Sequence, residues 1–310
     1  MSITNVLVCD RDGDTLVELI RNRRPDLELR ARTRDVMTPA DLTWADAMVG
    51  FAAGVDLSTS SIRWVHSTGA GVDALIAPGG WPEGVQLTRS PGSLGTRIGE
   101  YCLAHALAYT QRLDHFGRAQ SARRWSPRRT GGMSGTTVVV IGTGTVGRAI
   151  AQRFDTAGCS ALGVSRRGRP VPPFRSVHTP DRLGTLVEGA DWLVLAAPLT
   201  AETRGLVDQG VLARCRGTYV INVARGALVD DVALREALEV GRVTGASLDV
   251  FDEEPLPDTS GWWAAPGVRV TPHVAGVTLV EEAAAAFLDE LERRDTGRPP
   301  GWPVDPVAGY

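Results

Sequence analysis

Short apolar runs alternate with segments of helical periodicity along most of the chain. The runs are NVLVCD (5–10), DAMVGF (46–51), RWVHS (63–67), TTVVVIG (136–142), SALGVS (160–165), DWLVLAA (191–197), TYVINVA (218–224) and GASLDVF (245–251). Runs that are apolar on both faces are typical of parallel strands covered by helices on each side. The pattern therefore predicts an α/β fold made of βαβ units.

The runs form two series, which predict two doubly wound parallel-sheet domains. The segment RIGEYCLAHALAYTQRLDHF (97–116) has the periodicity of one long amphipathic helix between the series, and EEAAAAFLDELERR (281–294) predicts a helix that returns the chain to the first domain. The expected domains are therefore 1–96 with 277–310, and 97–276. The active site is expected in the cleft between them.

Composition narrows the class of partner. The 310 residues are 43% hydrophobic and 22% charged, with a net charge of −3, which is ordinary for a globular protein and gives no general attraction to nucleic acid or membranes. The arginine-rich segment RAQSARRWSPRRTGG (118–132) is interpreted as a polar, solvated or subunit-contacting loop. We expect a small-molecule partner.

The chain shows neither a long apolar span nor a signal sequence, so a cytoplasmic location is expected. Its four cysteines have no CxxC spacing, which predicts reduced, mostly buried thiols and no metal site. All 33 Lys and Arg residues are arginine. Lysine-based chemistry is thereby excluded, and arginine is the permanently cationic anchor for an anion.

A glycine-rich turn lies between a predicted strand and a predicted helix. In VVVIGTGTVGRAIA (138–151), Gly142, Gly144 and Gly147 have the G-x-G-x-x-G spacing. The first glycine permits a tight turn, the second lets a pyrophosphate approach the backbone, and the third allows close packing of helix and strand. The strand before and the helix after favour dinucleotide binding over an ordinary glycine-rich turn.

The end of the next predicted strand indicates which dinucleotide is preferred. An NAD site usually has an Asp or Glu there to accept the ribose hydroxyls. This chain has Ser165, Arg166 and Arg167 instead. Guanidinium groups suit a 2′-phosphate, so NADPH is expected to be preferred over NADH.

With these features, the chain resembles the D-isomer-specific 2-hydroxyacid dehydrogenases, especially their glyoxylate/hydroxypyruvate reductase branch. The resemblance covers nearly the whole length. The motifs that carry it are STGAGVD (67–73), GEYCLAHALA (99–108), VVVIGTGTVGRAIA (138–151), APLTAETRGLVD (197–208), INVARGALVDDVALREAL (221–238), LDVFDEEPLP (248–257), WWAAPGVRVTPHVAG (262–276) and VDPVAGY (304–310).

The resemblance implies a catalytic set of Arg225, Glu254 and His273. Arg225 would hold the carboxylate and carbonyl of a 2-keto acid, and a protonated His273 would donate a proton to the forming alkoxide. Glu254 would orient the imidazole. Chemistry alone leaves Glu253 open as the partner, whereas the family pattern, with the acid immediately before a proline, selects Glu254.

The resemblance also implies binding residues. Ala70 and Gly71 would hold the substrate carboxylate through backbone N–H groups, and Asp249 would contact the nicotinamide carboxamide. The full set of expected cofactor residues is Gly142, Gly144, Thr145, Val146, Gly147, Ser165, Arg166, Arg167, Ala197, Pro198, Val223 and Asp249. The residues around the substrate side chain stay open among Phe51, Ala52, Leu94, and Trp262 or Trp263.

The expected function is NADPH-dependent reduction of a small anionic 2-keto acid to its D-2-hydroxy acid, without any metal. A nucleotide-sensing regulatory protein is the alternative, because the family also includes corepressors with the same fold. A homodimer is expected through the apolar stripe of Tyr101, Leu103, Ala104, Leu107 and Ala108. Neither nucleic acid nor a membrane is an expected partner.

Overall fold

The computed structural model describes residues 3–51, 55–72, 75–76 and 80–307. The chain divides into two compact units: Met1–Leu94 with Val277–Tyr310 (unit 1), and Gly95–Gly276 (unit 2). Within the described ranges, no helix is long and apolar enough to cross a membrane.

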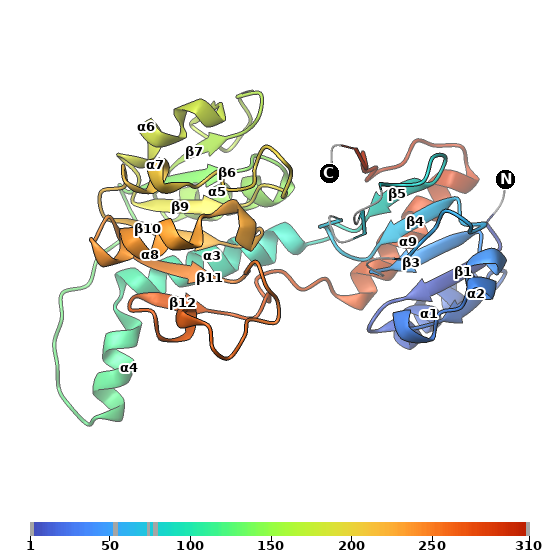
Figure 1. Cartoon of the computed structure of the whole chain (residues 1–310), viewed down its shortest axis with the longest axis horizontal. Coiled ribbons are helices and arrows are strands. Elements are labelled where there is room, and N and C mark those ends of the chain that lie inside the picture. Colours follow the sequence, from blue (N-terminus) through green and yellow to red (C-terminus); the bar gives the residue numbers. More distant parts are fainter. Residues whose placement is uncertain (1–2, 52–54, 73–74, 77–79, 308–310) are drawn as a thin grey trace. The chain divides into compact units, whose positions relative to one another are not determined.

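Unit 1 is built on a parallel five-stranded sheet (Figure 1). In order across the sheet, its strands are β2 (Glu28–Ala31), β1 (Asn5–Cys9), β3 (Ala47–Gly50), β4 (Trp64–Ser67) and β5 (Gln86–Arg89). The helices described in this unit are α1 (Gly13–Arg23), η1 (Arg34–Val36), α2 (Pro39–Trp44) and α9 (Val280–Asp295). Strand order reverses between β1 and β3, and ligands of such sheets bind where the order reverses, at the carboxyl ends of the strands.

The core of unit 1 depends on a helix from the far end of the sequence. Trp64 of β4 stacks on Phe287 of α9, with ring centroids 5.0 Å apart and planes 8° apart. Both rings are buried, and α9 also packs against α1. Residues 3–94 therefore form only part of their own hydrophobic core, and α9 completes it.

Unit 2 is built on a parallel seven-stranded sheet. In order, its strands are β12 (Val268–Val270), β11 (Val243–Leu248), β10 (Thr218–Asn222), β9 (Trp192–Leu195), β6 (Thr137–Ile141), β7 (Ser160–Val164) and β8 (Ser176–His178). Its described helices are α3 (Leu94–Thr110), α4 (Leu113–Ser121), α5 (Thr145–Thr156), η2 (Pro180–Arg182), α6 (Leu183–Val187), α7 (Gln209–Leu212), η3 (Gly226–Leu228), α8 (Asp231–Glu239) and η4 (Gly261–Ala264).

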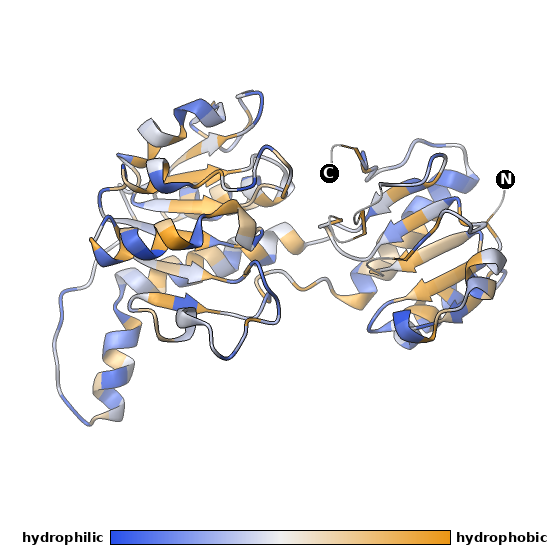
Figure 2. Cartoon of the chain, in the orientation of Figure 1, coloured by the Kyte–Doolittle hydropathy of each residue, from blue (hydrophilic) through white to orange (hydrophobic). Residues whose placement is uncertain are grey.

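The strands predicted from apolar runs lie inside the two sheets, which confirms the α/β class. Strands β9 and β10 are buried along their whole length, and Figure 2 shows apolar strands with more polar helices around them. In unit 2, the order reverses between β6 and β9. The carboxyl ends of these two strands therefore flank the crevice in which a doubly wound sheet binds a dinucleotide.

The single helix expected over 97–116 is wrong. The chain forms α3 and α4 with a break at Arg112, whose φ of 56° is left-handed and cannot continue a right-handed helix. Residues 118–121, expected in a loop, belong to α4. The apolar periodicity runs through the break because both helices have an apolar side, so the pattern gave no sign of the turn.

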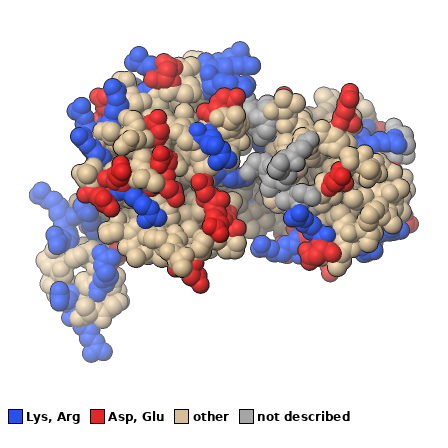
Figure 3. All heavy atoms as spheres, viewed as in Figure 1, with Lys and Arg blue, Asp and Glu red and all other residues tan. Residues whose placement is uncertain are grey.

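Helix α4 and the loop after it carry a concentration of positive charge. Figure 3 shows arginine side chains gathered over this part of unit 2. Apolar side chains are exposed among them: Leu113 is 56% exposed and Trp125 is 97% exposed. Tyr101, by contrast, does not belong to an outward stripe, because its hydroxyl bonds to Thr271 beside the sheet.

Candidate active site

The glycine turn after β6 has the geometry of a phosphate-binding loop. Gly142 has a φ of +101°, and a Cβ there would lie 2.6 Å from the carbonyl oxygen of Ala196. A Cβ on Gly147 would lie 1.8 Å from the carbonyl oxygen of Gly142. A Cβ on Gly144, at the start of α5, would meet nothing within 4 Å. The turn therefore requires glycine at two positions and leaves open space at the third, beside a helix N-terminus that favours anions.

The basic residues expected to select NADPH follow β7, the strand next to β6. The Ser165 N–H donates to the carbonyl of His178, and Arg166 and Arg167 are exposed. Because β6 and β7 are parallel neighbours, both guanidinium groups come from the same edge of the sheet as the glycine turn. A 2′-phosphate is an anion that such groups can hold.

The other expected cofactor residues also lie at this edge or next to it. Thr145 and Val146 begin α5, Ala197 and Pro198 follow β9, and Val223 follows β10. The Val223 N–H donates to the carbonyl of Leu195. These residues therefore surround the point where the strand order reverses.

Unit 2 brings His273 and Glu254 into contact. The imidazole Nδ1 lies 2.7 Å from Glu254 Oε2, with the two side chains 46% and 34% exposed. Glu254 Oε1 accepts from the Phe251 N–H at 2.8 Å, so the carboxylate is itself held. A carboxylate only accepts hydrogen bonds, so Nδ1 carries a hydrogen and Nε2 is the nitrogen left to face a substrate.

The loop that carries His273 is fixed by Asp249, which is 1% exposed. Its Oδ1 accepts from the Thr271 hydroxyl and the Val274 N–H, and its Oδ2 accepts from the Ala275 N–H. Its backbone carbonyl accepts from the His273 N–H at 2.8 Å. His273 has a φ of 54°, so one aspartate maintains an unfavourable backbone conformation. The expected nicotinamide contact of Asp249 stays a prediction.

Arg225 approaches the same region from the end of β10. It caps η3 and is half-buried, and its Nη1 donates to the carbonyl of Ala224 at 2.6 Å. A Cβ on the next residue, Gly226, would lie 2.2 Å from the carbonyl carbon of Phe251. This close approach packs the Arg225 loop against the segment that leads to Glu254.

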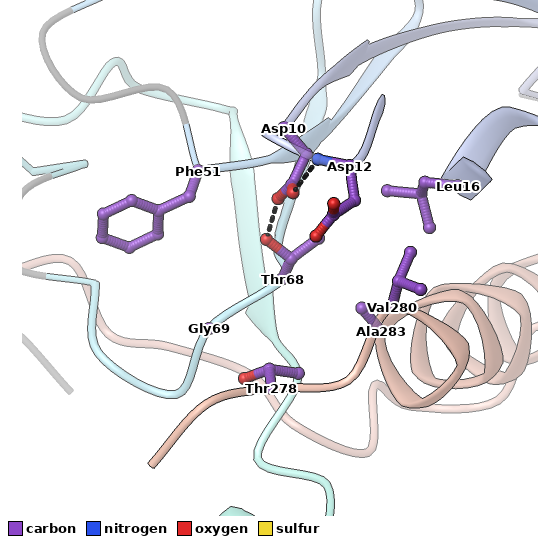
Figure 4. Close-up of a pocket in the computed structure, with 9 residues that line it drawn as sticks. All are labelled: Asp10, Asp12, Leu16, Phe51, Thr68, Gly69, Thr278, Val280 and Ala283. Carbon is purple, nitrogen blue, oxygen red and sulfur yellow. Dashed lines mark hydrogen bonds between the residues drawn. The ribbon is translucent and has the colours of Figure 1, made fainter. Parts of the chain in front are cut away.

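The expected carboxylate loop of unit 1 follows β4 and borders a small cavity. Figure 4 shows this cavity, of about 130 Å³, where β1, β3 and β4 end. The Thr68 hydroxyl donates to Asp10 Oδ2 at 2.5 Å, and the Ser67 hydroxyl donates to the carbonyl of Gly69 at 3.1 Å. These two bonds fix the first half of the loop.

Arg89, which the sequence did not single out, lies beside the second half of the loop. Its Nη1 donates to the carbonyl of Ala70 at 3.1 Å. The sequence feature that could have identified Arg89 as functional is its position at the end of a parallel strand, where functional side chains gather. That signal was hidden because the QLTR segment was not predicted to be a strand.

Burial distinguishes among the residues that were expected to contact the side chain of the substrate. Trp262 is 2% exposed and packs in the core of unit 2, with Arg235 over its ring at 3.6 Å. Trp263 is 53% exposed, Phe51 is exposed and Leu94 is buried. Burial therefore favours Trp263 over Trp262 of the pair, while Ala52 lies outside the described residues.

All four cysteines are free and buried, as expected, and burial raises the pKa of the Cys9 thiol to about 11. No group of three or more His, Cys, Asp or Glu side chains among the described residues is arranged to hold a metal ion. His66 is fully buried in unit 1.

Comparison with known proteins identifies the family. The model for "D-isomer specific 2-hydroxyacid dehydrogenase, NAD binding domain" matches residues 103–275. A glyoxylate/hydroxypyruvate reductase A from Yersinia enterocolitica is 31% identical over 300 residues, covering 94% of each chain.

Two solved structures are similar over nearly the whole chain. A D-isomer specific 2-hydroxyacid dehydrogenase from Xanthobacter autotrophicus Py2, in complex with NADPH and MES, has a TM-score of 0.88, 31% identity and 100% coverage of both chains. An NADPH-dependent glyoxylate/hydroxypyruvate reductase from Sinorhizobium meliloti, with NADP and sulfate, has a TM-score of 0.88, 29% identity, and coverage of 99% of this chain and 100% of that one. The chain belongs to the D-isomer specific 2-hydroxyacid dehydrogenase family.

Proposed function

We propose that the protein reduces a small anionic 2-keto acid, of the size of glyoxylate or hydroxypyruvate, to its D-2-hydroxy acid with NADPH. The observation that carries this proposal is the 2.7 Å pairing of His273 with Glu254, in the unit that also holds the glycine turn and Arg225. A positioned proton donor, a cation and a dinucleotide turn are what carbonyl reduction requires.

His273 is proposed to supply the proton. With Nδ1 donating to Glu254, the protonated imidazole has its second hydrogen on Nε2. That hydrogen passes to the substrate oxygen as negative charge develops there, which is general acid catalysis. Glu254 fixes which nitrogen is used and keeps the ring from turning, so the proton is aimed before the substrate arrives.

Arg225 is proposed to hold the substrate. A guanidinium can donate to the carboxylate and to the carbonyl oxygen of the same 2-keto acid. We further propose that the Ala70–Gly71 segment of unit 1 binds the substrate carboxylate through its backbone N–H groups.

The proposal of NADPH as cofactor rests on how the glycine turn after β6 fits a pyrophosphate. Gly144 leaves open space at the N-terminus of α5, and Arg166 and Arg167 follow the neighbouring strand. These residues would hold the pyrophosphate and the 2′-phosphate, respectively. When bound, the cofactor supplies the hydride. The relatives solved with NADPH or NADP support this choice of dinucleotide.

The test is a panel of 2-keto acids assayed by the loss of NADPH absorbance, with chiral analysis of the product. We expect turnover of glyoxylate and hydroxypyruvate, and D-glycerate from the latter. Arg225→Ala should lower kcat and raise KM together, because that charge acts in both the ground and transition states. NADPH binding without turnover of any member of the panel would reject the reductase and favour the nucleotide-sensing alternative.

A further inference from the structure

The loop after β4 offers two backbone donors without partners. Within the described ranges, neither the Ala70 N–H nor the Gly71 N–H donates a hydrogen bond. Both residues are only half-buried. Adjacent free N–H groups form a concave site for an anion, whereas the rest of this loop is already bonded through Ser67 and Thr68.

Arg89 fixes the orientation of the peptide between these two residues. Its Nη1 donates to the carbonyl of Ala70 at 3.1 Å. A trans peptide is planar, with its N–H directed opposite to its C=O. Because the Ala70 carbonyl faces the guanidinium, the Gly71 N–H points away from it. The positive charge also polarises that peptide and makes its N–H a stronger donor.

The side chain of Arg89 is partly buried. No carboxylate in the described residues pairs with it, and its Nε is buried without a hydrogen-bond partner. Burial lowers the pKa of its guanidinium. Even a partly buried cation without a counter-charge is costly. An anion bound at the neighbouring loop would supply that counter-charge.

We propose that Arg89 is a positioning residue for the substrate carboxylate: it orients the Ala70–Gly71 peptide and supplies positive charge behind it. This inference rests on the proposed function, because the anion is taken to be the 2-keto acid. The guanidinium acts through the loop, and the backbone N–H groups make the contact. The ligand class is a small carboxylate.

The first arm of the test is the steady-state kinetics of Arg89→Met with glyoxylate. We expect KM to rise about tenfold or more, which is the scale of one charge-assisted interaction. We expect kcat to change by less than about threefold, because the carboxylate is held equally in the ground and transition states. Arg89→Lys keeps the positive charge but lacks the planar donor arrangement of a guanidinium, so its KM should lie between those of Arg89→Met and the wild type.

The matched control is Arg294→Met. Arg294 belongs to the same unit, and burial lowers the pKa of its guanidinium as well. It contacts Gln86, at the opposite end of β5 from Arg89. We expect its KM for glyoxylate to match the wild type.

The second arm is independent of turnover and uses oxalate as the probe. Oxalate should raise the thermal midpoint of the wild type and of Arg294→Met, and should fail to raise that of Arg89→Met. This arm still tests Arg89 if the wild type reduces no keto acid, in which case the proposed function alone fails. Without oxalate, we expect Arg89→Met to be as stable as the wild type, because a partly buried charge without a carboxylate partner among the described residues has been removed.

The proposal is overturned if KM for glyoxylate is the same in Arg89→Met and Arg294→Met. Equal stabilisation of Arg89→Met and the wild type by oxalate would also overturn it. If Arg89→Met is less stable than the wild type, the oxalate shift decides, because a purely structural arginine would leave that shift intact.

Discussion

His273 occupies a backbone conformation that residues with side chains rarely adopt, with a φ of 54°. Asp249 maintains it through one backbone and two side-chain oxygens. Such a backbone conformation costs free energy, and it serves a function here because the imidazole must point in one direction. Orientation that is fixed before binding does not have to be supplied at each turnover.

The role of His273 predicts a specific defect in His273→Asn. Asparagine tolerates a left-handed φ better than alanine does, so the loop should keep its shape while the acid is lost. We expect kcat to fall by about 10² to 10⁴, the usual worth of general acid catalysis, with NADPH affinity unchanged. Steady-state kinetics and a fluorescence titration with NADPH measure the two quantities. Retention of kcat within about tenfold would contradict the assignment.

Arg166 and Arg167 predict the choice of dinucleotide. We expect kcat/KM to favour NADPH over NADH by at least about tenfold, because one guanidinium–phosphate interaction is worth about 1.5–3 kcal/mol. The double variant Arg166→Ala/Arg167→Ala should raise KM for NADPH and leave the kinetics with NADH nearly unchanged. Arg216→Ala is the control, since Arg216 is exposed and precedes β10, at the opposite end of the sheet. Equal efficiency with the two dinucleotides in the wild type would reject this prediction.

At the scale of elements, strands β4 and β5 are joined through a buried histidine. His66 Nδ1 lies 2.8 Å from the Thr88 hydroxyl, and Nε2 lies 2.8 Å from the Ser90 hydroxyl. Phe287 in α9 also packs against the imidazole in a T-shaped arrangement, with ring centroids 5.7 Å apart. Burial lowers the pKa of His66 to about 3, so the folded protein keeps this imidazole neutral.

This burial predicts a loss of stability in mild acid. The pKa of His66 is lower in the folded than in the unfolded chain, so the unfolded chain takes up the proton first as pH falls below about 6.5. The free energy of unfolding should therefore decrease by about 1 kcal/mol per pH unit between about pH 6 and pH 5. Urea titrations measure this slope, and His66→Gln should reduce it.

Proton NMR keeps the acid prediction testable if His66→Gln does not fold. The His66 ring resonances should stay constant down to about pH 4.5, and the other four histidines provide an internal reference. A His66 midpoint near that of a free histidine would contradict the prediction.

The sequence could predict the elements whose signal is local. The glycine turn and the central strands β6, β9 and β10 have patterns complete within a few residues. The edge strands β2, β5, β8 and β12 were missed because they are short, partly polar and defined mainly by pairing with a neighbour. The break at Arg112 depends on one backbone angle, which the apolar pattern does not report.

In the candidate site, too, residues with a local sequence pattern could be predicted and residues that depend on distant contacts could not. Arg225, Glu254 and His273 were identified through motifs, and the structure brings two of them into contact. The role of Asp249 depends on donors 22 to 26 residues away in the chain, and that of Arg89 on a carbonyl 19 residues away. Contacts of this length follow from the fold and leave no local pattern.

At the scale of the whole molecule, the exposed apolar side chains around α3 and α4 predict a homodimer. Leu107 and Leu113 are 40% and 56% exposed, and such patches mark association surfaces. Light scattering at micromolar concentration should give twice the monomer mass. Leu107→Glu/Leu113→Glu should give a monomer, whereas Val240→Glu, an exposed position after α8, should not. A monomeric wild type would contradict the prediction.

The dependence of unit 1 on α9 has a consequence for biosynthesis. Domains usually fold in the order in which they leave the ribosome. Here, however, Trp64 cannot stack on Phe287 until Phe287 has been synthesised, which happens after all of unit 2. At about 5–20 residues per second, residues 95–276 take about 10–40 s to synthesise. During that time, the apolar residues of unit 1 that α9 covers stay exposed, and a chaperone can bind them. Unit 2, by contrast, has every residue of its own core as soon as residue 276 is made. The inner unit is therefore expected to fold first, and the chain's first strands among the last.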